Sequence, residues 1–274
     1  MPRRFNLTQS LMLTPVLILY GLAAATPILM IAQLSFKKGL GTFGDLFASP
    51  IFLRIAQNTL VISLETTLVA VLLAYAIAAL LAQSGERARA WIMAAILLPF
   101  WTAALIKNFA WSALLQDNGV INLALMHLGI VSHPLPLLHT RLAVVIGMVH
   151  YVIPYAVFPI YSSMLAIDPR LYRAARSLGA PGWRTVVSVT LPLTRPGLYA
   201  GGLLVFIICL GFYITPVLLG SPREMMVANL VDFYTHQIID FPMASALALV
   251  ILVATAFLIA LYHSIPKEGQ YGKI

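Results

Sequence analysis

Six long apolar runs, separated by polar segments, dominate the pattern of hydrophobic and polar positions along this chain. They lie at about 11–34, 59–82, 90–110, 142–164, 197–219 and 243–263. Each run is long enough for an α-helix to cross a hydrocarbon layer about 30 Å thick. The pattern predicts an all-α, polytopic membrane protein whose six transmembrane helices form a single domain over residues 1–274.

The composition supports a membrane protein and argues against a soluble one. Of the 274 residues, 61% are hydrophobic and only 9% are charged, and the mean hydropathy is +0.92. Soluble domains are typically about 45–50% apolar and about 25% charged. The first run follows Arg3 and Arg4, as in a signal peptide, but it continues to Leu34 and is therefore predicted to be an uncleaved span.

The distribution of lysine and arginine predicts the orientation of the spans. With the N-terminus inside, eleven of the 17 basic residues fall in inside segments and six fall in outside segments. Cytoplasmic loops carry such an excess, so both termini are predicted to be cytoplasmic. The net charge of +8 is explained by this topology, and no nucleic-acid partner is expected.

The segment 165–196 is an inside loop of unusual length, with five arginines, between the fourth and fifth spans. Asp168-Pro169 favours the start of a helix and Gly179 favours its end, while Trp183 to Thr190 is predicted to form a second short helix that Leu191-Pro192 ends. Leu171, Ala174, Ala175 and Leu178 share one face of the first helix. A hairpin lying on lipid, with arginines on phosphate groups, is the alternative interpretation.

The same loop resembles a motif of a known transporter family. Ala174-Ala175, three residues, Gly179, nine residues and Val189-Thr190-Leu191-Pro192 match the spacing of the EAA motif of ABC importer permeases. Arg173 stands where that motif has glutamate, and Val189 stands where it has isoleucine. The resemblance implies that the first helix is a coupling helix. It assigns ATPase coupling to Leu171, Arg173, Ala174, Ala175, Leu178, Gly179, Val189, Leu191 and Pro192.

Further segments are similar to the polyamine (spermidine and putrescine) branch of these permeases. They are Pro99-Phe100-Trp101-Thr102, Leu105-Ile106-Lys107, Asn122 with Leu128-Gly129, the segments 151–155 and 159–163, and Thr215 to Gly220. The resemblance implies a subunit of the bacterial inner membrane that forms half of a path for a small organic solute. The implied partners are a second homologous permease, two cytoplasmic ATP-binding subunits and a periplasmic solute-binding protein.

The chain itself is not expected to be an enzyme or to bind a cofactor. It contains no G-x-x-x-x-G-K-[ST] sequence, so ATP and Mg²⁺ are expected to be used by the partner ATPase subunits. The histidines at 127, 133, 139 and 150 match no zinc-ligand spacing, and no metal site is predicted. Two alternatives stay open from the residues: a stand-alone secondary transporter or channel, and a membrane-embedded enzyme, for which no catalytic constellation is found.

Candidates for the translocation path are charged, amide and aromatic residues within or beside the spans. Glu65 lies in the second span, where a charge is a functional candidate or a hydrogen-bonded link between helices. Aromatic rings can hold alkylammonium groups by cation–π contact, although packing explains many of them. The predicted path residues are Glu65, Trp101, Asn108, Tyr151, Tyr155 and Tyr213. Lys107 is expected to extend its side chain to the outer interface.

Overall fold

The computed structural model describes residues 7–264, and every regular element in this range is helical. In chain order the elements are α1 (Leu7–Ser35), α2 (Gly41–Ala48), α3 (Pro50–Gln83), α4 (Glu86–Phe100), α5 (Ala104–Leu115), α6 (Val120–His127), α7 (Arg141–Leu165), α8 (Pro169–Ser177), α9 (Gly182–Thr185), the π-helical η1 (Val186–Thr190), α10 (Leu191–Leu210), α11 (Ile214–Leu219), the 3₁₀ turn η2 (Pro222–Glu224), α12 (Val227–His236) and α13 (Phe241–Ser264).

The predicted all-α polytopic fold is confirmed. Among the described residues, five helices are long and apolar enough to cross a membrane: Thr14–Ser35, Pro50–Gln83, Arg141–Leu165, Gly182–Leu210 and Phe241–Ser264. A sixth crossing is made if the bent pair Glu86–Phe100 and Ala104–His127 counts as one broken span, whose two parts are inclined by 97°.

Small residues bring α3, α7 and α10 together in the centre of the bundle. Ala70, Ala74 and Ala78 follow one another at four-residue spacing along α3, and all three are buried. On α10, Gly197 and Gly201 face α7 so closely that a Cβ at Gly197 would lie 2.6 Å from the Pro159 carbonyl oxygen. Such small-residue interfaces let helix backbones approach each other, which is how membrane helices pack without a hydrophobic driving force between them.

Two of the expected spans differ from the structure because each contains a break. The run 90–110 is interrupted at residues 101–103, where Pro99 weakens the end of α4 and Ala103 adopts an extended conformation before α5. The run 197–219 is interrupted at residues 211–213, after Gly211 ends α10. Pro216 lies in the first turn of α11, where its missing amide hydrogen leaves no helix bond unmade.

The expected helix end at Leu191-Pro192 differs as well. The helix that begins at Gly182 continues through the π-helical segment η1 into α10, and Pro192 falls in the first turn of α10. The wider π-helical turn accommodates a residue without an amide hydrogen, so the proline does not end the helix. As a result, one continuous helix of 29 residues runs from Gly182 to Leu210.

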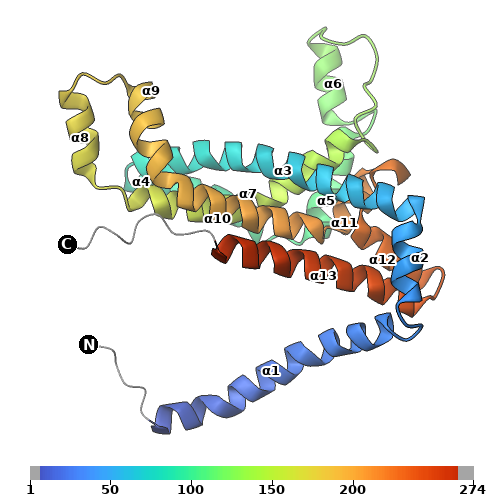
Figure 1. Ribbon diagram of the computed structural model, residues 1–274. Coiled ribbons are helices and arrows are strands. Elements are labelled where there is room, and N and C mark those ends of the chain that lie inside the picture. Colours follow the sequence, from blue (N-terminus) through green and yellow to red (C-terminus); the bar gives the residue numbers. More distant parts are fainter. Residues whose placement is uncertain (1–6, 265–274) are drawn as a thin grey trace.

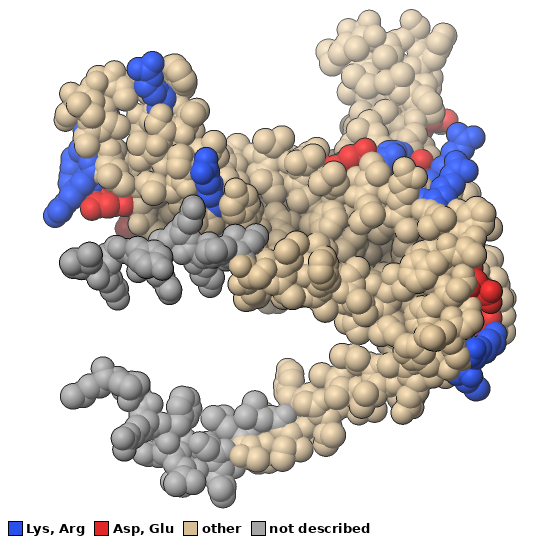
Figure 2. All heavy atoms as spheres, in the orientation of Figure 1, with Lys and Arg blue, Asp and Glu red and all other residues tan. Residues whose placement is uncertain are grey.

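The bundle has two distinct ends. Figure 1 shows α8 and α9 extending from one end, where α1 begins and α13 ends, whereas α2, α6 and α12 lie at the opposite end. Figure 2 shows that charged side chains on this face gather toward the two ends and that few lie on the surface between them. The helix α1 contacts α13 and diverges from the remaining helices, so apolar side chains such as Leu19 and Tyr20 are exposed.

Candidate translocation site and coupling helix

The two helix breaks both meet α7 at the same place. Five aromatic rings, which we call the aromatic ladder, join them: Trp101, Phe100, Tyr155, Tyr151 and Phe212 in order of contact. The ring centroids of Tyr151 and Tyr155 lie 6.1 Å apart in a stacked arrangement, one helical turn apart on α7. Phe100 lies 5.5 Å from Tyr155, and Phe212 meets Tyr151 edge-on at 5.2 Å. The ladder therefore connects the α4–α5 break with the α10–α11 break.

The ladder is most exposed at one end. Tyr151, Tyr155 and Phe212 are partly buried, whereas Trp101, at the end of the ladder, is 85% exposed and touches only the edge of Phe100 among the rings. Tyr213, the next residue after Phe212, is also exposed, and its carbonyl oxygen accepts a 2.9 Å hydrogen bond from the Asn229 side chain. A surface of exposed aromatic rings next to two broken helices can receive a solute or another subunit.

Lys107 is buried beside the ladder and does not extend to an interface as expected. Its residue exposure is 9%, and its Nζ atom lies 4.4 Å from the centroid of the Tyr151 ring. The reason is the α4–α5 break, which turns the chain by 97° and directs α5 against α7. Pro99 is the sequence signal for this placement, because a proline in the middle of an apolar run indicates a possible break.

The fixed charge of Lys107 restricts what can bind to the same ring. In the described part of the chain, no carboxylate forms an ion pair with its ammonium group. A second cation on the same face of Tyr151 would lie within about 5 Å of Lys107, and two like charges at that distance repel by about 3 kcal/mol at an effective dielectric constant of about 20. Two ammonium groups therefore do not share this face of the ring.

Asn108 and Glu65 are engaged with groups outside the ladder. Asn108 is buried, its amide nitrogen donates to the Ala104 carbonyl oxygen at 2.9 Å, and its side chain lies close to Gly147 of α7. Glu65 of α3 accepts a 2.8 Å hydrogen bond from Nε of Arg141 at the start of α7. Of the predicted path residues, the structure thus brings together Trp101, Tyr151 and Tyr155, with Tyr213 adjacent. The functional role of each stays a prediction.

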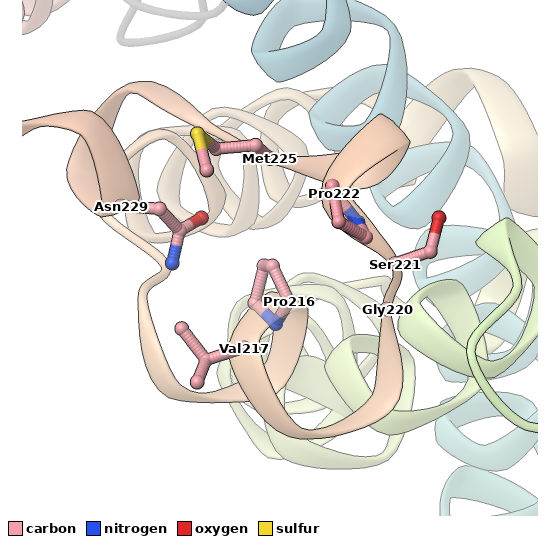
Figure 3. A pocket seen from close by; sticks show the side chains of 7 residues that line it. All are labelled: Pro216, Val217, Gly220, Ser221, Pro222, Met225 and Asn229. Carbon is pink, nitrogen blue, oxygen red and sulfur yellow. The ribbon is translucent and has the colours of Figure 1, made fainter. Parts of the chain in front are cut away.

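A small cavity of about 200 Å³ lies between α11 and α12 at the end opposite α8. Figure 3 shows its lining residues: Pro216, Val217, Gly220, Ser221, Pro222, Met225 and Asn229. The Asn229 amide is already engaged, because it accepts from the Met226 amide at 2.9 Å and donates to the Tyr213 carbonyl oxygen. The lining has neither a carboxylate nor an aromatic ring, so the cavity does not have the chemistry of a cation site.

The helix α8 has the capping that the sequence predicts. At its start, the Asp168 carboxylate accepts a 2.8 Å hydrogen bond from the Arg170 amide. At its end, Gly179 has φ +73°, its amide donates to the Arg176 carbonyl oxygen, and the Ala180 amide donates to the Ala175 carbonyl oxygen, both at 3.0 Å. This pair of bonds is a Schellman motif, which needs a left-handed residue that glycine supplies at low cost.

The coupling residues lie on two connected surfaces. On α8 and its C-terminal end, Leu171, Arg173, Ala174 and Gly179 are exposed, Ala175 is partly buried, and Leu178 is 87% exposed. Val189 lies in η1, and Leu191 and Pro192 begin α10. The Thr190 hydroxyl donates to the Tyr172 hydroxyl at 3.4 Å, which links α8 to the long helix 182–210. An exposed leucine at the tip of a rigid, capped helix favours docking of another protein.

A bundle of membrane-spanning helices with two broken spans and a capped helix projecting from one end is typical of one class of protein, the membrane permease. The sequence model of one family, described as the binding-protein-dependent transport system inner membrane component, matches residues 70–267. This match covers most of the chain, which therefore belongs to that family. Family membership favours the importer subunit over the stand-alone transporter and the membrane-embedded enzyme.

Several named proteins are similar to this chain. The spermidine/putrescine transport system permease protein PotB of Haemophilus influenzae is 32% identical over 235 residues, which cover 85% of this chain and 81% of that protein. PotB of Escherichia coli is 30% identical over 213 residues, 78% of each chain. A chain from the crystal structure of a bacterial alginate ABC transporter, in complex with its pentasaccharide-bound periplasmic protein, shares the fold. It aligns with a TM-score of 0.75 at 21% identity, over 92% of this chain and 91% of that chain.

Proposed function

We propose that this permease forms half of the path by which an ABC importer carries a polyamine, or a closely related organic cation, across the inner membrane. Two observations support this class of solute. The chain is 30–32% identical to permeases named for spermidine and putrescine. The aromatic ladder also offers ring faces, which attract ammonium groups within about 6 Å of the ring centroid.

The observation that carries the coupling part of the proposal is the continuous helix 182–210. It starts beside α8, is joined to α8 by the Thr190–Tyr172 contact, and ends at the break that presents Phe212 to Tyr151. A rigid helix transmits a displacement at one end to its other end. Movement of α8 is therefore passed to the ladder without any change within the helix.

The energy source lies in the partner subunits. Two ATP-binding subunits dock on α8 of this chain and on the equivalent helix of a second permease, and they bind and hydrolyse ATP with Mg²⁺. Closure of the ATPase pair displaces α8, and the ladder then changes its access from one side of the membrane to the other. A periplasmic solute-binding protein delivers the cation to the opposite end of the bundle.

The proposed orientation places α8 and both termini in the cytoplasm. The start of α1, the end of α13 and α8 lie at the same end of the bundle. Arg170, Arg173, Arg176 and Arg184 lie at this end, as expected from the excess of positive charge in cytoplasmic segments. The exposed Trp101 end of the ladder faces the second permease, so that the path lies between the two subunits.

The docking step is tested with the Ala174→Arg variant. Ala174 is exposed on α8, so an arginine there leaves the fold intact and obstructs close approach of a partner. We expect the tagged variant, solubilised from its native host, to lose co-purifying ATPase subunits while its own yield and thermal stability are retained. The matched control is Ala48→Arg, an exposed alanine of α2 at the opposite end of the bundle, which is expected to co-purify normally. Normal co-purification of Ala174→Arg would contradict docking on α8.

The class of solute is tested separately on the assembled importer in proteoliposomes. We expect spermidine, delivered by the solute-binding protein, to be taken up and to stimulate ATP hydrolysis. A complex that assembles but neither transports spermidine or putrescine nor hydrolyses ATP faster in their presence would contradict the polyamine assignment and leave the family assignment unchanged.

A further inference from the structure

Lys107 is a buried cation next to the site that we assign to a cationic solute. Its ammonium group lies 4.4 Å from the Tyr151 ring centroid, and the described residues supply it with no acidic partner. His150, the residue before Tyr151 on α7, interacts electrostatically with Lys107, and its Nδ1 atom accepts a 3.0 Å hydrogen bond from the Trp111 indole. The ring of Tyr151 is therefore the group that stabilises the buried charge.

The same ring is central to the aromatic ladder. Tyr151 stacks on Tyr155 and receives the edge of Phe212, so it lies between the two rings that connect it to both helix breaks. An alkylammonium ion that enters the ladder is attracted to the open face of a tyrosine ring. On Tyr151 this position is occupied by the ammonium group of Lys107, which is chemically the same as one end of a polyamine.

We propose that Lys107 is an internal substitute for the transported cation, which holds the Tyr151 site when no solute is present and is displaced when a solute ammonium takes its place. The inference rests on the proposed polyamine function and names the position at which one end of the solute binds. Mutual exclusion follows from the strong repulsion between two ammonium groups over one ring.

The structure gives Lys107 the means to move. Its ammonium is carried on a four-carbon stem with several rotatable bonds, and its helix begins at the α4–α5 break, only three residues before Lys107. Each cation–π contact is modest in strength, so a solute with several ammonium groups can compete with a single lysine. Lysine at this position thus keeps the site closed to weakly binding monovalent cations and yields to a polyamine.

The test measures binding of radiolabelled spermidine to the complex of permeases and ATP-binding subunits in nanodiscs, without the solute-binding protein. Lys107→Met removes the charge and keeps the stem, so we expect spermidine to bind about tenfold more tightly than to wild type. Lys107→Arg keeps a cation over the ring and is expected to bind like wild type. Lys37→Met, at an exposed lysine, is the matched control and is expected to leave binding unchanged.

A second substitution tests whether the higher affinity of Lys107→Met for spermidine depends on the Tyr151 ring. Tyr151→Leu in the Lys107→Met background removes the shared face, so we expect it to abolish the increase in affinity. The affinity for n-butylammonium, a single alkylammonium ion, is measured by its competition with spermidine. We expect this affinity to rise in Lys107→Met and to fall again when Tyr151→Leu is added. Lys107→Gln serves for the same measurement if Lys107→Met fails to assemble with the ATP-binding subunits.

The outcomes separate this inference from the proposed function. Unchanged or weaker spermidine binding by an assembled Lys107→Met complex, with wild-type uptake intact, would overturn the substitute role and leave the polyamine function standing. A gain for butylammonium without any spermidine uptake by wild type would support the site and contradict the polyamine function. Loss of binding of an anionic solute such as sulfate on Lys107→Met would show that Lys107 is an anion-binding residue and would overturn the inference.

Discussion

Nε of Arg141 donates a 2.8 Å hydrogen bond to Oε2 of Glu65 and so joins the start of α7 to α3. Both side chains are partly exposed, at 40% for Arg141 and 43% for Glu65. An intramembrane glutamate is a natural candidate for binding a cationic solute, but this one is engaged with an arginine and lies apart from the aromatic ladder. Its position therefore indicates a link between two helices of the central bundle.

Glu65→Gln is expected to have a small effect on stability and on transport. Because the pair is more than a third exposed, its net contribution is about 0–1 kcal/mol. We expect the apparent melting temperature in detergent to fall slightly and spermidine uptake to stay close to wild type. The double variant Glu65→Gln/Arg141→Gln, compared with both single variants, gives the coupling energy of the pair. Complete loss of uptake by stable, assembled Glu65→Gln protein would instead place Glu65 in the path.

Two glycines of α10 are expected to respond differently to alanine, because Gly197 lies in the close contact with α7 and Gly202 does not. A Cβ at Gly197 would lie 2.6 Å from the Pro159 backbone oxygen, which cannot move without shifting α7. Gly197→Ala is therefore expected to destabilise the protein by about 1–3 kcal/mol, as overpacking does. The readout is the loss of monodisperse protein after heating, followed by size-exclusion chromatography.

Gly202→Ala is the matched control on the same helix. A Cβ there would meet the Val71 side chain at 3.6 Å, an ordinary van der Waals distance. Alanine is favoured over glycine in a helix by about 1 kcal/mol, so Gly202→Ala is expected to be neutral or stabilising. Equal destabilisation by both substitutions would show that the α7–α10 contact is not the cause.

The sequence predicts those parts of the fold that depend on local patterns. Length and hydropathy identify the spans, and the Asp168-Pro169 and Gly179 signals identify both ends of α8, because caps are set by neighbouring residues. The breaks at 101–103 and 211–213 do not follow from the sequence in the same way. Apolar composition continues through both of them, and a proline within a transmembrane run is compatible with either a continuous or a broken helix.

The candidate site can be predicted in its residue types but not in its arrangement. Tyr151 and Tyr155 lie one turn apart on a single helix, so their contact follows from helical spacing. The contacts of Tyr155 with Phe100 and of Tyr151 with Phe212 join residues that are far apart in the chain, and no local pattern indicates them. In a straight span, Lys107 would lie at the outer end and reach the interface; the 97° bend moves it beside Tyr151.

The left-handed conformation of Gly179 predicts a specific effect on coupling. A non-glycine L-residue at φ +73° is strained by about 1–2 kcal/mol, and no neighbouring atom lies within 4 Å of a Cβ there, so the strain is conformational alone. We expect Gly179→Ala to loosen the end of α8 and to lower solute-stimulated ATP hydrolysis of the importer several-fold. Gly179→Asn is expected to restore much of it, because asparagine tolerates this conformation.

Gly182→Ala is the control for this series. A Cβ at Gly182 would also have no neighbouring atom within 4 Å, but the backbone conformation there suits any residue. Gly182→Ala therefore introduces the same methyl group three residues after Gly179 without backbone strain. We expect the rate of ATP hydrolysis by this variant to match that of wild type. If Gly179→Ala behaves like Gly182→Ala, the Schellman motif does not contribute to coupling.

Asn122 organises the projecting α6 hairpin through three hydrogen bonds. Its amide nitrogen donates to the carbonyl oxygens of Gln116 at 3.2 Å and Leu135 at 3.0 Å, and its side-chain oxygen accepts from the Leu135 amide at 2.9 Å. The residue is fully buried, so Asn122→Ala leaves these backbone groups without their partner at a cost of about 1–3 kcal/mol for each unsatisfied group. Because this hairpin projects from the bundle (Figure 1), we expect local opening without global unfolding.

Limited digestion with proteinase K should then cut the segment 128–140 faster in Asn122→Ala than in wild type, as located by mass spectrometry. Asn118→Ala, at an exposed asparagine of the same hairpin, should be digested like wild type. A global fall in melting temperature with unchanged digestion of 128–140 would show instead that Asn122 supports the bundle.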